Sequence, residues 1–216
     1  MSTPLHPLFL NLKGRNCVLV GGNEAAETKI RDLLDSGAKI EVIASVVSPQ
    51  ITAWSQAGML HWEARDYQHG DLRDAFLVVS VADPETNARV FAEAEARRVL
   101  CNAVDDIEHC NCYAAAVVRR GPLQIAISTA GQSPAFAQRL RNELEVQFDA
   151  DYAPWVEKLG ELRSRLLRDE GIDSERRRAI LHEQASASSY EAFRSSLKEG
   201  SFRQGSGENS NGADAP

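Results

Sequence analysis

The sequence predicts an α/β fold: a Rossmann-like, doubly wound parallel sheet, followed by a small α+β segment and a C-terminal helical domain. Over the first half of the chain, short apolar runs alternate with amphipathic helical segments, which is typical of a parallel sheet covered by helices. Gly21 and Gly22 follow the first apolar run directly. After Asp106 the alternation gives way to a hairpin pattern and long helical segments.

The first elements make a βαβ unit. Asn16–Val20 has the apolar, β-branched character of a buried strand, Glu24–Ser36 repeats apolar residues at helical spacing, and Gly37 supplies a helix stop. Lys39–Ala44 is a second strand, joined to the first by a right-handed crossover. The remaining elements expected in the sheet domain are helices at Ser48–Gln56 and Pro84–Arg97 and strands at Met59–Ala64, Ala75–Val81 and Val99–Val104.

A hairpin opens the second part of the chain. Ala114–Arg119 and Leu123–Thr129 read as its strands, and Ser133 with Pro134 can open a helix that runs to about Phe148. Two further helical stretches, Tyr152–Arg168 and Ser174–Lys198, precede a Gly/Ser/Asn-rich end that should be disordered. We therefore expect a nucleotide-binding domain at 1–113, a dimerisation and substrate segment at 114–150, a helical domain at 151–198 and a disordered tail at 199–216.

Composition excludes several classes of protein. The 24 Lys and Arg residues against 31 Asp and Glu give a net charge of −7, which argues against a nucleic-acid partner bound through a basic surface. No apolar run approaches the roughly 18 residues of a membrane span, and the N-terminus lacks the pattern of a secretory signal. Four cysteines do not make a disulfide scaffold, so we expect a cytoplasmic protein. Together with the charge and the short apolar runs, this predicts no nucleic-acid or membrane partner.

The glycine turn is a candidate dinucleotide site. Residues 21–26 (GGNEAA) approximate the G-x-G-x-x-G/A fingerprint, which places a pyrophosphate at a helix N-terminus. Asn23 replaces the middle glycine, and its side chain occupies space next to the ligand. The second strand ends in Ala44 and Ser45 without an acidic residue, so Ser45 alone could hydrogen-bond a ribose there. A tight strand-to-helix turn without a ligand accounts for the same residues equally well.

Several motifs in order along the chain match one known family. These are PLFLNLKGRNCVLVGG and SGAKIEVIA near the start, Asp83 with Asn87, CNAVD at 101–105, and RGPLQIAISTAGQSPA at 120–135. Over about residues 5–195 the chain resembles the siroheme-synthase N-terminal module, a group that includes the stand-alone precorrin-2 dehydrogenase/sirohydrochlorin ferrochelatases. The 216 residues leave no room for a methyltransferase domain, so we expect a stand-alone module that receives precorrin-2 from another protein.

The resemblance implies NAD-dependent oxidation of precorrin-2 to sirohydrochlorin, followed in many members by insertion of Fe²⁺ at the same site. It also implies a homodimer that binds a tetrapyrrole, with Asp105 matching the family's catalytic aspartate. Backbone amides at a helix N-terminus and arginine side chains suit the carboxylates of such a pigment. The expected cofactor residues are Gly21, Gly22, Asn23, Glu24, Ala25, Ala44, Ser45, Ala82 and Asp83, and the expected substrate residues are Arg120, Thr129, Ala130, Gly131, Ser133 and Arg141.

Departures from the family pattern are compatible with two other functions. Asn23 and Val81 replace a glycine and a threonine on the cofactor side, which fits a ferrochelatase with weakened or lost dehydrogenase activity. A non-catalytic tetrapyrrole-binding protein on the same fold is a further alternative. The cluster Cys101, His109, Cys110 and Cys112 offers soft metal ligands. However, Cys110-x-Cys112 lacks the two-residue spacing of most structural zinc sites, so we expect no dedicated metal site.

Overall fold

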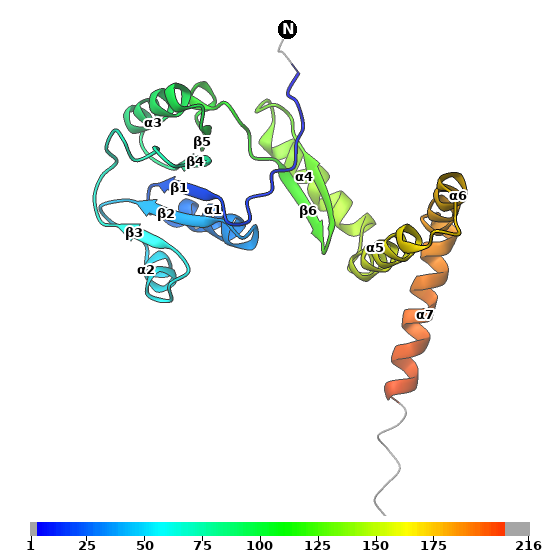
Figure 1. Cartoon of the computed structure of the whole chain (residues 1–216). Coiled ribbons are helices and arrows are strands. Elements are labelled where there is room, and N and C mark those ends of the chain that lie inside the picture. Colours follow the sequence, from blue (N-terminus) through cyan, green and yellow to red (C-terminus); the bar gives the residue numbers. More distant parts are fainter. Residues whose placement is uncertain (1–3, 206–216) are drawn as a thin grey trace, which may run out of the picture. The chain divides into compact units, whose positions relative to one another are not determined.

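The computed structural model describes residues 4–205 and contains the expected parallel sheet (Figure 1). Its five strands lie in the order β3-β2-β1-β4-β5, and every neighbouring pair is parallel. This order, with β1 at the centre, is that of nucleotide-binding α/β folds, so the predicted fold class is confirmed. The strands are β1 (Asn16–Val20), β2 (Lys39–Ile43), β3 (His61–Glu63), β4 (Leu77–Ser80) and β5 (Leu100–Ala103).

Helices cover both faces of this sheet, which is why its central strands are buried on both sides. Helices α1 (Glu24–Asp35) and α2 (Pro49–Gln56) lie on one face and α3 (Pro84–Arg97) on the other, below and above the sheet in Figure 1. The amphipathic pattern explains each contact, since α1 buries Ile30 and Leu33 in one core cluster while α3 buries its own apolar residues in the other.

Two contact clusters divide the chain. Among the described residues, the first unit comprises 4–114 together with Ser128–Ser133, and the second comprises Ala115–Ile127 and 134–205. The second unit contains the antiparallel hairpin β6 (Ala116–Arg120) and β7 (Leu123–Ile127), the short α+β element expected from the sequence. Its helices are α4 (Pro134–Gln147), α5 (Tyr152–Arg168), α6 (Ser174–Gln184) and α7 (Ala187–Gly205).

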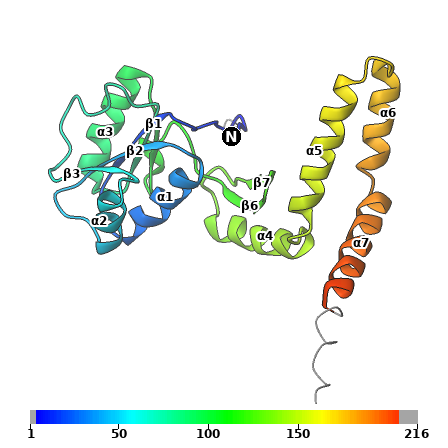
Figure 2. The ribbon, with the colours of Figure 1, turned by 60° about the horizontal axis from the view of Figure 1, so that its bottom comes forward.

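Aromatic side chains join the long helices of the second unit. Figure 2 shows α5 running alongside α6 and α7, which return in the opposite direction. Tyr152 of α5 stacks on Tyr190 of α7 with ring centroids 4.2 Å apart, and buried Trp155 lies 5.1 Å from the ring of Phe193. The amphipathic face predicted for Tyr152–Arg168 therefore has its partner within the chain.

Several boundaries differ from the sequence expectation. The stretch Ser174–Lys198 is two helices, because the hydroxyl of Ser186 accepts a hydrogen bond from the Ser189 amide and starts a new helix. Helix α7 then continues to Gly205, so residues 199–205 of the expected disordered tail are helical, and 206–216 lie outside the described residues. Within residues 4–205, no helix is both long and apolar enough to traverse a bilayer.

A buried carboxylate ties α3 to the loop between β3 and β4. The Glu93 side chain is 0% exposed, and its oxygens accept hydrogen bonds from the hydroxyl of Tyr67 (2.6 Å), the amides of Gly70 (2.8 Å) and Leu72 (3.3 Å), and Nε of Arg97 (2.6 Å). Burial by itself raises the pKa of Glu93, but these hydrogen bonds outweigh it and hold the pKa below its ordinary value. The ionised carboxylate therefore stabilises the fold at neutral pH.

We predict that Glu93→Gln lowers the free energy of unfolding by about 3 kcal/mol at neutral pH, since it breaks a buried, charge-assisted network. Because the folded-state pKa is lowered, this stabilisation is present above the ordinary carboxyl pKa and is lost as the pH falls through the folded value. Urea unfolding at neutral and acidic pH measures both effects. Glu85→Gln, at an exposed position of the same helix, is the control and should change stability by less than about 1 kcal/mol. A pH-independent loss in Glu93→Gln would contradict the role of the charge.

Candidate functional site

A cavity of about 370 Å³ opens at the carboxyl ends of β1, β2 and β4. In an open α/β sheet this is where ligands bind, at the point where connections from neighbouring strands leave in opposite directions. We call it the carboxyl-edge cavity. Six of the nine residues expected to hold a cofactor line it: Gly21, Gly22, Ala44, Ser45, Ala82 and Asp83. Asn23, Glu24 and Ala25 come next along the chain, at the cap and first turn of α1.

Both glycines are required by close backbone contacts. Gly21 has φ +117°, and a Cβ there would lie 2.6 Å from the carbonyl oxygen of Val81. A Cβ at Gly22 would collide with the backbone of Val46 and Val47. Glycine therefore allows the β1–α1 turn to pack against the segments that follow β2 and β4, and it leaves the cavity wall without side chains at these positions.

Asn23 acts as the N-cap of α1. Its backbone is extended (φ −83°), so the position does not need the left-handed conformation that glycine favours. Its side-chain oxygen accepts a hydrogen bond from the amide of Ala26 at 3.1 Å. This amide is thus already satisfied, and a bound phosphate would have fewer free amides at this helix end than in a turn with glycine here. The cavity and the glycine turn fit a dinucleotide, with the phosphate contact reduced at this one position.

Asp83 caps α3 at another wall of the cavity. Its carboxylate accepts hydrogen bonds from the amides of Glu85 and Thr86, both at 3.0 Å, and from the Thr86 hydroxyl at 2.8 Å. These bonds, the Thr86 amide first, hold the pKa of Asp83 below its ordinary value. Asp83 therefore fixes the start of α3 as an ionised cap.

Sequence reasoning missed a cation in this cavity. Arg89 of α3 lines it, donates to the carbonyl oxygen of Tyr67 at 3.2 Å, and lies 5.6 Å from the Tyr67 ring centroid. A guanidinium here is suited to a phosphate or carboxylate. The sequence did contain a clue to Arg89, namely the helix cap at Asp83. Thr86 and Arg89 follow this cap by three and six residues, so they lie on the first turns of the same helix.

Asp105 lies in a strained turn directly after β5. The carbonyl oxygen of Ala103 accepts from the amide of Asp106 at 3.4 Å, and Asp105 has φ 59°. Positive φ is uncommon for a residue other than glycine and is often found at functional sites. Asp105 is exposed, and among the described residues its carboxylate has no hydrogen-bond or ion-pair partner. The carboxylate is therefore available to a substrate.

The loop Ser128–Ser133 belongs to the same unit as Asp105. The amide of Gln132 donates to the carbonyl oxygen of Thr129 at 2.9 Å, and Ala130 and Gly131 both have positive φ (51° and 77°). A Cβ at Gly131 would lie 2.7 Å from Cδ1 of Ile107, so the loop packs on the 3₁₀ turn η1 (Ile107–His109) that follows Asp105. Thr129, Ala130, Gly131 and Ser133 are thus close in the fold to the turn that carries Asp105.

The two expected substrate arginines lie in the second unit. Arg120 donates from Nε to the carbonyl oxygen of Phe148 (2.7 Å) and from a terminal nitrogen to that of Glu145 (2.9 Å), which ties β6 to the end of α4. Arg141 lies 3.8 Å from Glu145 on the same helix and is partly exposed. Arg120 is therefore used in packing, whereas Arg141 makes only weak surface contacts.

The cysteines near Asp105 are thiols at neutral pH. Burial raises the pKa of Cys101 to about 12 and that of Cys112 to about 11. Metal binding and nucleophilic attack both need the thiolate. Among the described residues, the group of metal-ligating atoms that lie together is a different one, Glu41, His61 and Glu63, whose ligand atoms are within 4.8 Å of one another.

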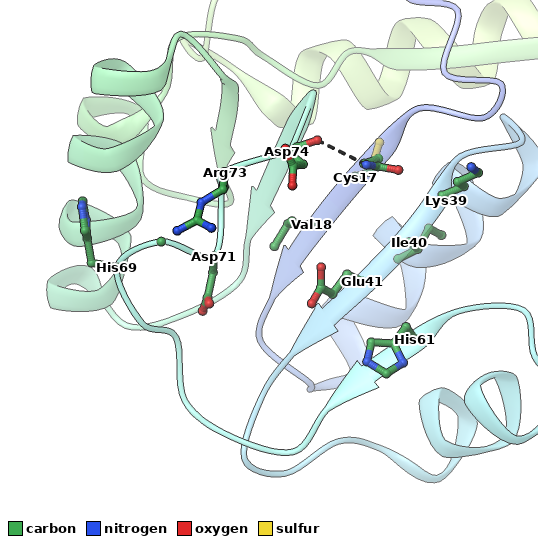
Figure 3. Close-up of a pocket in the computed structure, with 12 residues that line it drawn as sticks. Cys17, Val18, Lys39, Ile40, Glu41, His61, His69, Asp71, Arg73 and Asp74 are labelled. Carbon is green, nitrogen blue, oxygen red and sulfur yellow. Dashed lines mark hydrogen bonds between the residues drawn. The ribbon is translucent and has the colours of Figure 1, made fainter.

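Glu41 and His61 line a second cavity, of about 630 Å³, on neighbouring strands (Figure 3). This cavity lies at the amino-terminal ends of β1, β2 and β3, away from the edge where α/β sheets bind ligands. His61, with 67% of its side chain exposed, is 2.8 Å from Glu63, and Arg65 lies 3.8 Å from the same carboxylate. Because the larger cavity lies at the amino-terminal ends of the strands, we assign the cofactor to the smaller, carboxyl-edge cavity.

Comparisons with known proteins agree with this geometry. A family model described as putative NAD(P)-binding matches residues 8–116, about half of the chain, and one described as sirohaem biosynthesis protein central matches residues 120–147. The fold and the cavity thus define a Rossmann-like nucleotide-binding protein. The chain belongs to the putative NAD(P)-binding family that the first of these models describes.

Two relatives and one solved structure are also similar. Siroheme synthase 1 of Serratia proteamaculans (strain 568) and siroheme synthase of Shigella sonnei (strain Ss046) are each 38% identical over 173 residues, which is 80% of this chain. The chain spans only 36% and 38% of the length of these relatives. A structure titled SirC, precorrin-2 dehydrogenase is 26% identical, with a TM-score of 0.70 over 90% of this chain and 100% of that chain.

We predict that Gly21→Ala lowers the free energy of unfolding by at least about 2 kcal/mol and weakens NAD⁺ binding, since the new Cβ would collide with the Val81 carbonyl group. Thermal unfolding and NAD⁺ titration by calorimetry measure the two effects. Gly58→Ala is the matched control: it has φ +70° but no atom within 4 Å of the added Cβ, so it reports backbone strain alone. Equal losses in both variants would contradict the packing role of Gly21.

We also predict that Asp105→Gly is more stable than Asp105→Ala by about 1 kcal/mol, because only glycine adopts φ 59° without strain. Both variants lack the carboxylate, so their difference isolates the backbone. Urea unfolding measures it. An Asp105→Ala protein as stable as Asp105→Gly would show that the turn is not strained.

Proposed function

We propose that this chain catalyses the NAD-dependent oxidation of precorrin-2 to sirohydrochlorin, and that insertion of Fe²⁺ into this product at the same site then gives sirohaem. One observation carries the proposal: Asp105, exposed and without a side-chain partner among residues 4–205, follows β5 of the sheet whose carboxyl edge holds the cavity beside the glycine turn. Similarity to siroheme synthases and to a precorrin-2 dehydrogenase structure supports the same substrate.

In this proposal some residues of the chain bind the cofactor and one, Asp105, acts as the general base. NAD⁺, when bound, accepts a hydride from the substrate. Gly21 and Gly22 leave the cavity wall open to the cofactor, and Arg89 offers a positive charge to its phosphates. Loss of a hydride leaves one ring proton to remove, and Asp105 takes it as general base and returns it to water. The same carboxylate is the base for the two pyrrole protons that leave when Fe²⁺ enters the pigment.

Substrate carboxylates need donors near this base. For this role we propose the amides of Thr129 and Gly131 and the hydroxyls of Thr129 and Ser133. The amides of Ala130, Gln132 and Ser133 already donate within the loop. Arg141 and the remaining N–H groups of Arg120 belong to the second unit, and we propose them as further donors to substrate carboxylates. We propose a role for each part of the chain. Residues 1–113 hold the cofactor, residues 114–150 provide the dimer contact and part of the substrate site, and residues 151–198 form a helical domain. A homodimer in the cytoplasm remains a prediction.

A second candidate is a ferrochelatase with weak or absent dehydrogenase activity. The observation that favours it is the Asn23 cap, which occupies the Ala26 amide that a pyrophosphate could otherwise use. The two candidates differ in one measurable property, the requirement for NAD⁺.

The test is an assay with precorrin-2, followed by pigment absorbance and NADH formation, with Fe²⁺ added in a second stage. We expect NAD⁺-dependent conversion, and we expect Asp105→Asn to reduce both stages by about 100-fold or more, since it removes the base but keeps the shape. Glu108→Gln, an exposed neighbour, is the control and should leave both rates unchanged.

Other outcomes overturn the proposal in defined ways. Fe²⁺ insertion into supplied sirohydrochlorin without any NAD⁺-dependent oxidation would establish the chelatase alternative. Tight pigment binding with neither reaction would indicate a non-catalytic binding protein.

A further inference from the structure

The backbone at Asp105 has a positive φ, so neighbouring contacts must stabilise this conformation. Positive φ is uncommon for a residue other than glycine, and a φ of 59° persists where the surrounding structure fixes it. The Asp105 side chain itself has no partner in the described structure, so the constraint comes from its neighbours. The adjacent residue, Asp106, is held by two contacts.

Asp106 is anchored to the interior of the sheet domain. Its Oδ2 accepts a hydrogen bond from the side-chain amide of Asn87 at 3.2 Å, and Asn87 is only 2% exposed. The Asn87 oxygen in turn accepts from the hydroxyl of Ser80, a fully buried residue of β4, at 2.6 Å. A continuous polar chain therefore runs from β4 through α3 to the residue beside Asp105.

His109 holds the same carboxylate from the other side. Its Nδ1 lies 2.8 Å from Oδ2 of Asp106, and an ionised carboxylate can only accept, so the imidazole donates. This hydrogen bond keeps the pKa of Asp106 below its ordinary value. The His109 ring is fixed by an edge-on contact with Phe91 of α3, with ring centroids 5.8 Å apart.

The backbone on both sides of Asp105 is also held. The sulfur of Cys110 lies 3.1 Å from the carbonyl oxygen of Ala103 and 3.3 Å from that of Asp106, and it accepts from the Ala103 amide at 3.2 Å. The thiol therefore joins the first and last residues of the turn. These contacts leave the Asp105 side chain as the part of the turn directed to solvent.

We propose that Asp106, held by Asn87 and His109, is a positioning residue that fixes the backbone at Asp105 and thereby the direction from which the Asp105 carboxylate meets the reacting ring. This inference rests on the proposed function, in which Asp105 is the base. A displacement of a base by about 1 Å can cost up to 100-fold in rate, so the effect should fall on turnover and not on binding.

The experiment measures steady-state oxidation of precorrin-2 by NAD⁺ in the full chain. Asp106→Ala removes both contacts, and we expect kcat to fall about 10-fold or more while the KM values for NAD⁺ and precorrin-2 stay within about twofold. Asp106→Asn keeps an acceptor oxygen of the same shape and should retain activity within about threefold of the wild type. Glu108→Gln removes a nearby exposed charge and should change nothing.

A double variant separates positioning from a purely structural role. If Asp106 acts through Asp105, adding Asp106→Ala to Asp105→Asn should cause no further loss of the residual rate. A structural role would instead lower the melting temperature and reduce the residual rate by the same factor in both backgrounds. That result, or a loss confined to KM, would overturn the inference. An inactive wild type would overturn the proposed function and this inference together, whereas an active wild type with an unaffected Asp106→Ala variant would overturn only the inference.

Discussion

The packing of the β1–α1 turn against the segments after β2 and β4 is the contact on which the site depends. Gly21 donates to the carbonyl oxygen of Ile43 at 3.0 Å, and Ser48 donates to that of Gly22 at 2.8 Å. On the other side Val81 donates to Val20 at 2.8 Å. These bonds bring three strand ends together at the edge where the cavity lies, and the two glycines leave part of its wall without side chains.

Three helices begin at or near this edge, and each is capped by a side chain. Asn23, Ser48 and Asp83 accept hydrogen bonds from the first-turn amides of α1, α2 and α3. The caps stabilise the helices but compete with a ligand for the same amides. A bound phosphate here would depend on the amides that remain free and on the guanidinium of Arg89, which makes this edge a compromise between fold stability and cofactor affinity.

Backbone strain concentrates where the chemistry is proposed. Asp105 and Ala130 are two of the three non-glycine residues with positive φ in the described structure, and both belong to the unit that holds the carboxyl-edge cavity. The polar chain through Ser80, Asn87 and Asp106 lies beneath the first of them. Such strain is offset by the surrounding contacts.

The sequence alone determined the fold class and several elements to the residue, including β1, α3 and α5, because hydrophobic periodicity and cap residues act within a few positions of each other. It also predicted six residues of the cavity wall from the glycine turn and the family motifs. Only the tertiary structure decided the positions of Arg89, the Glu93 network and the Asp106–His109 pair, and only it showed that Arg120 is used in packing. Most of these depend on contacts between residues distant in sequence, formed once the sheet has assembled, and no local pattern encodes them.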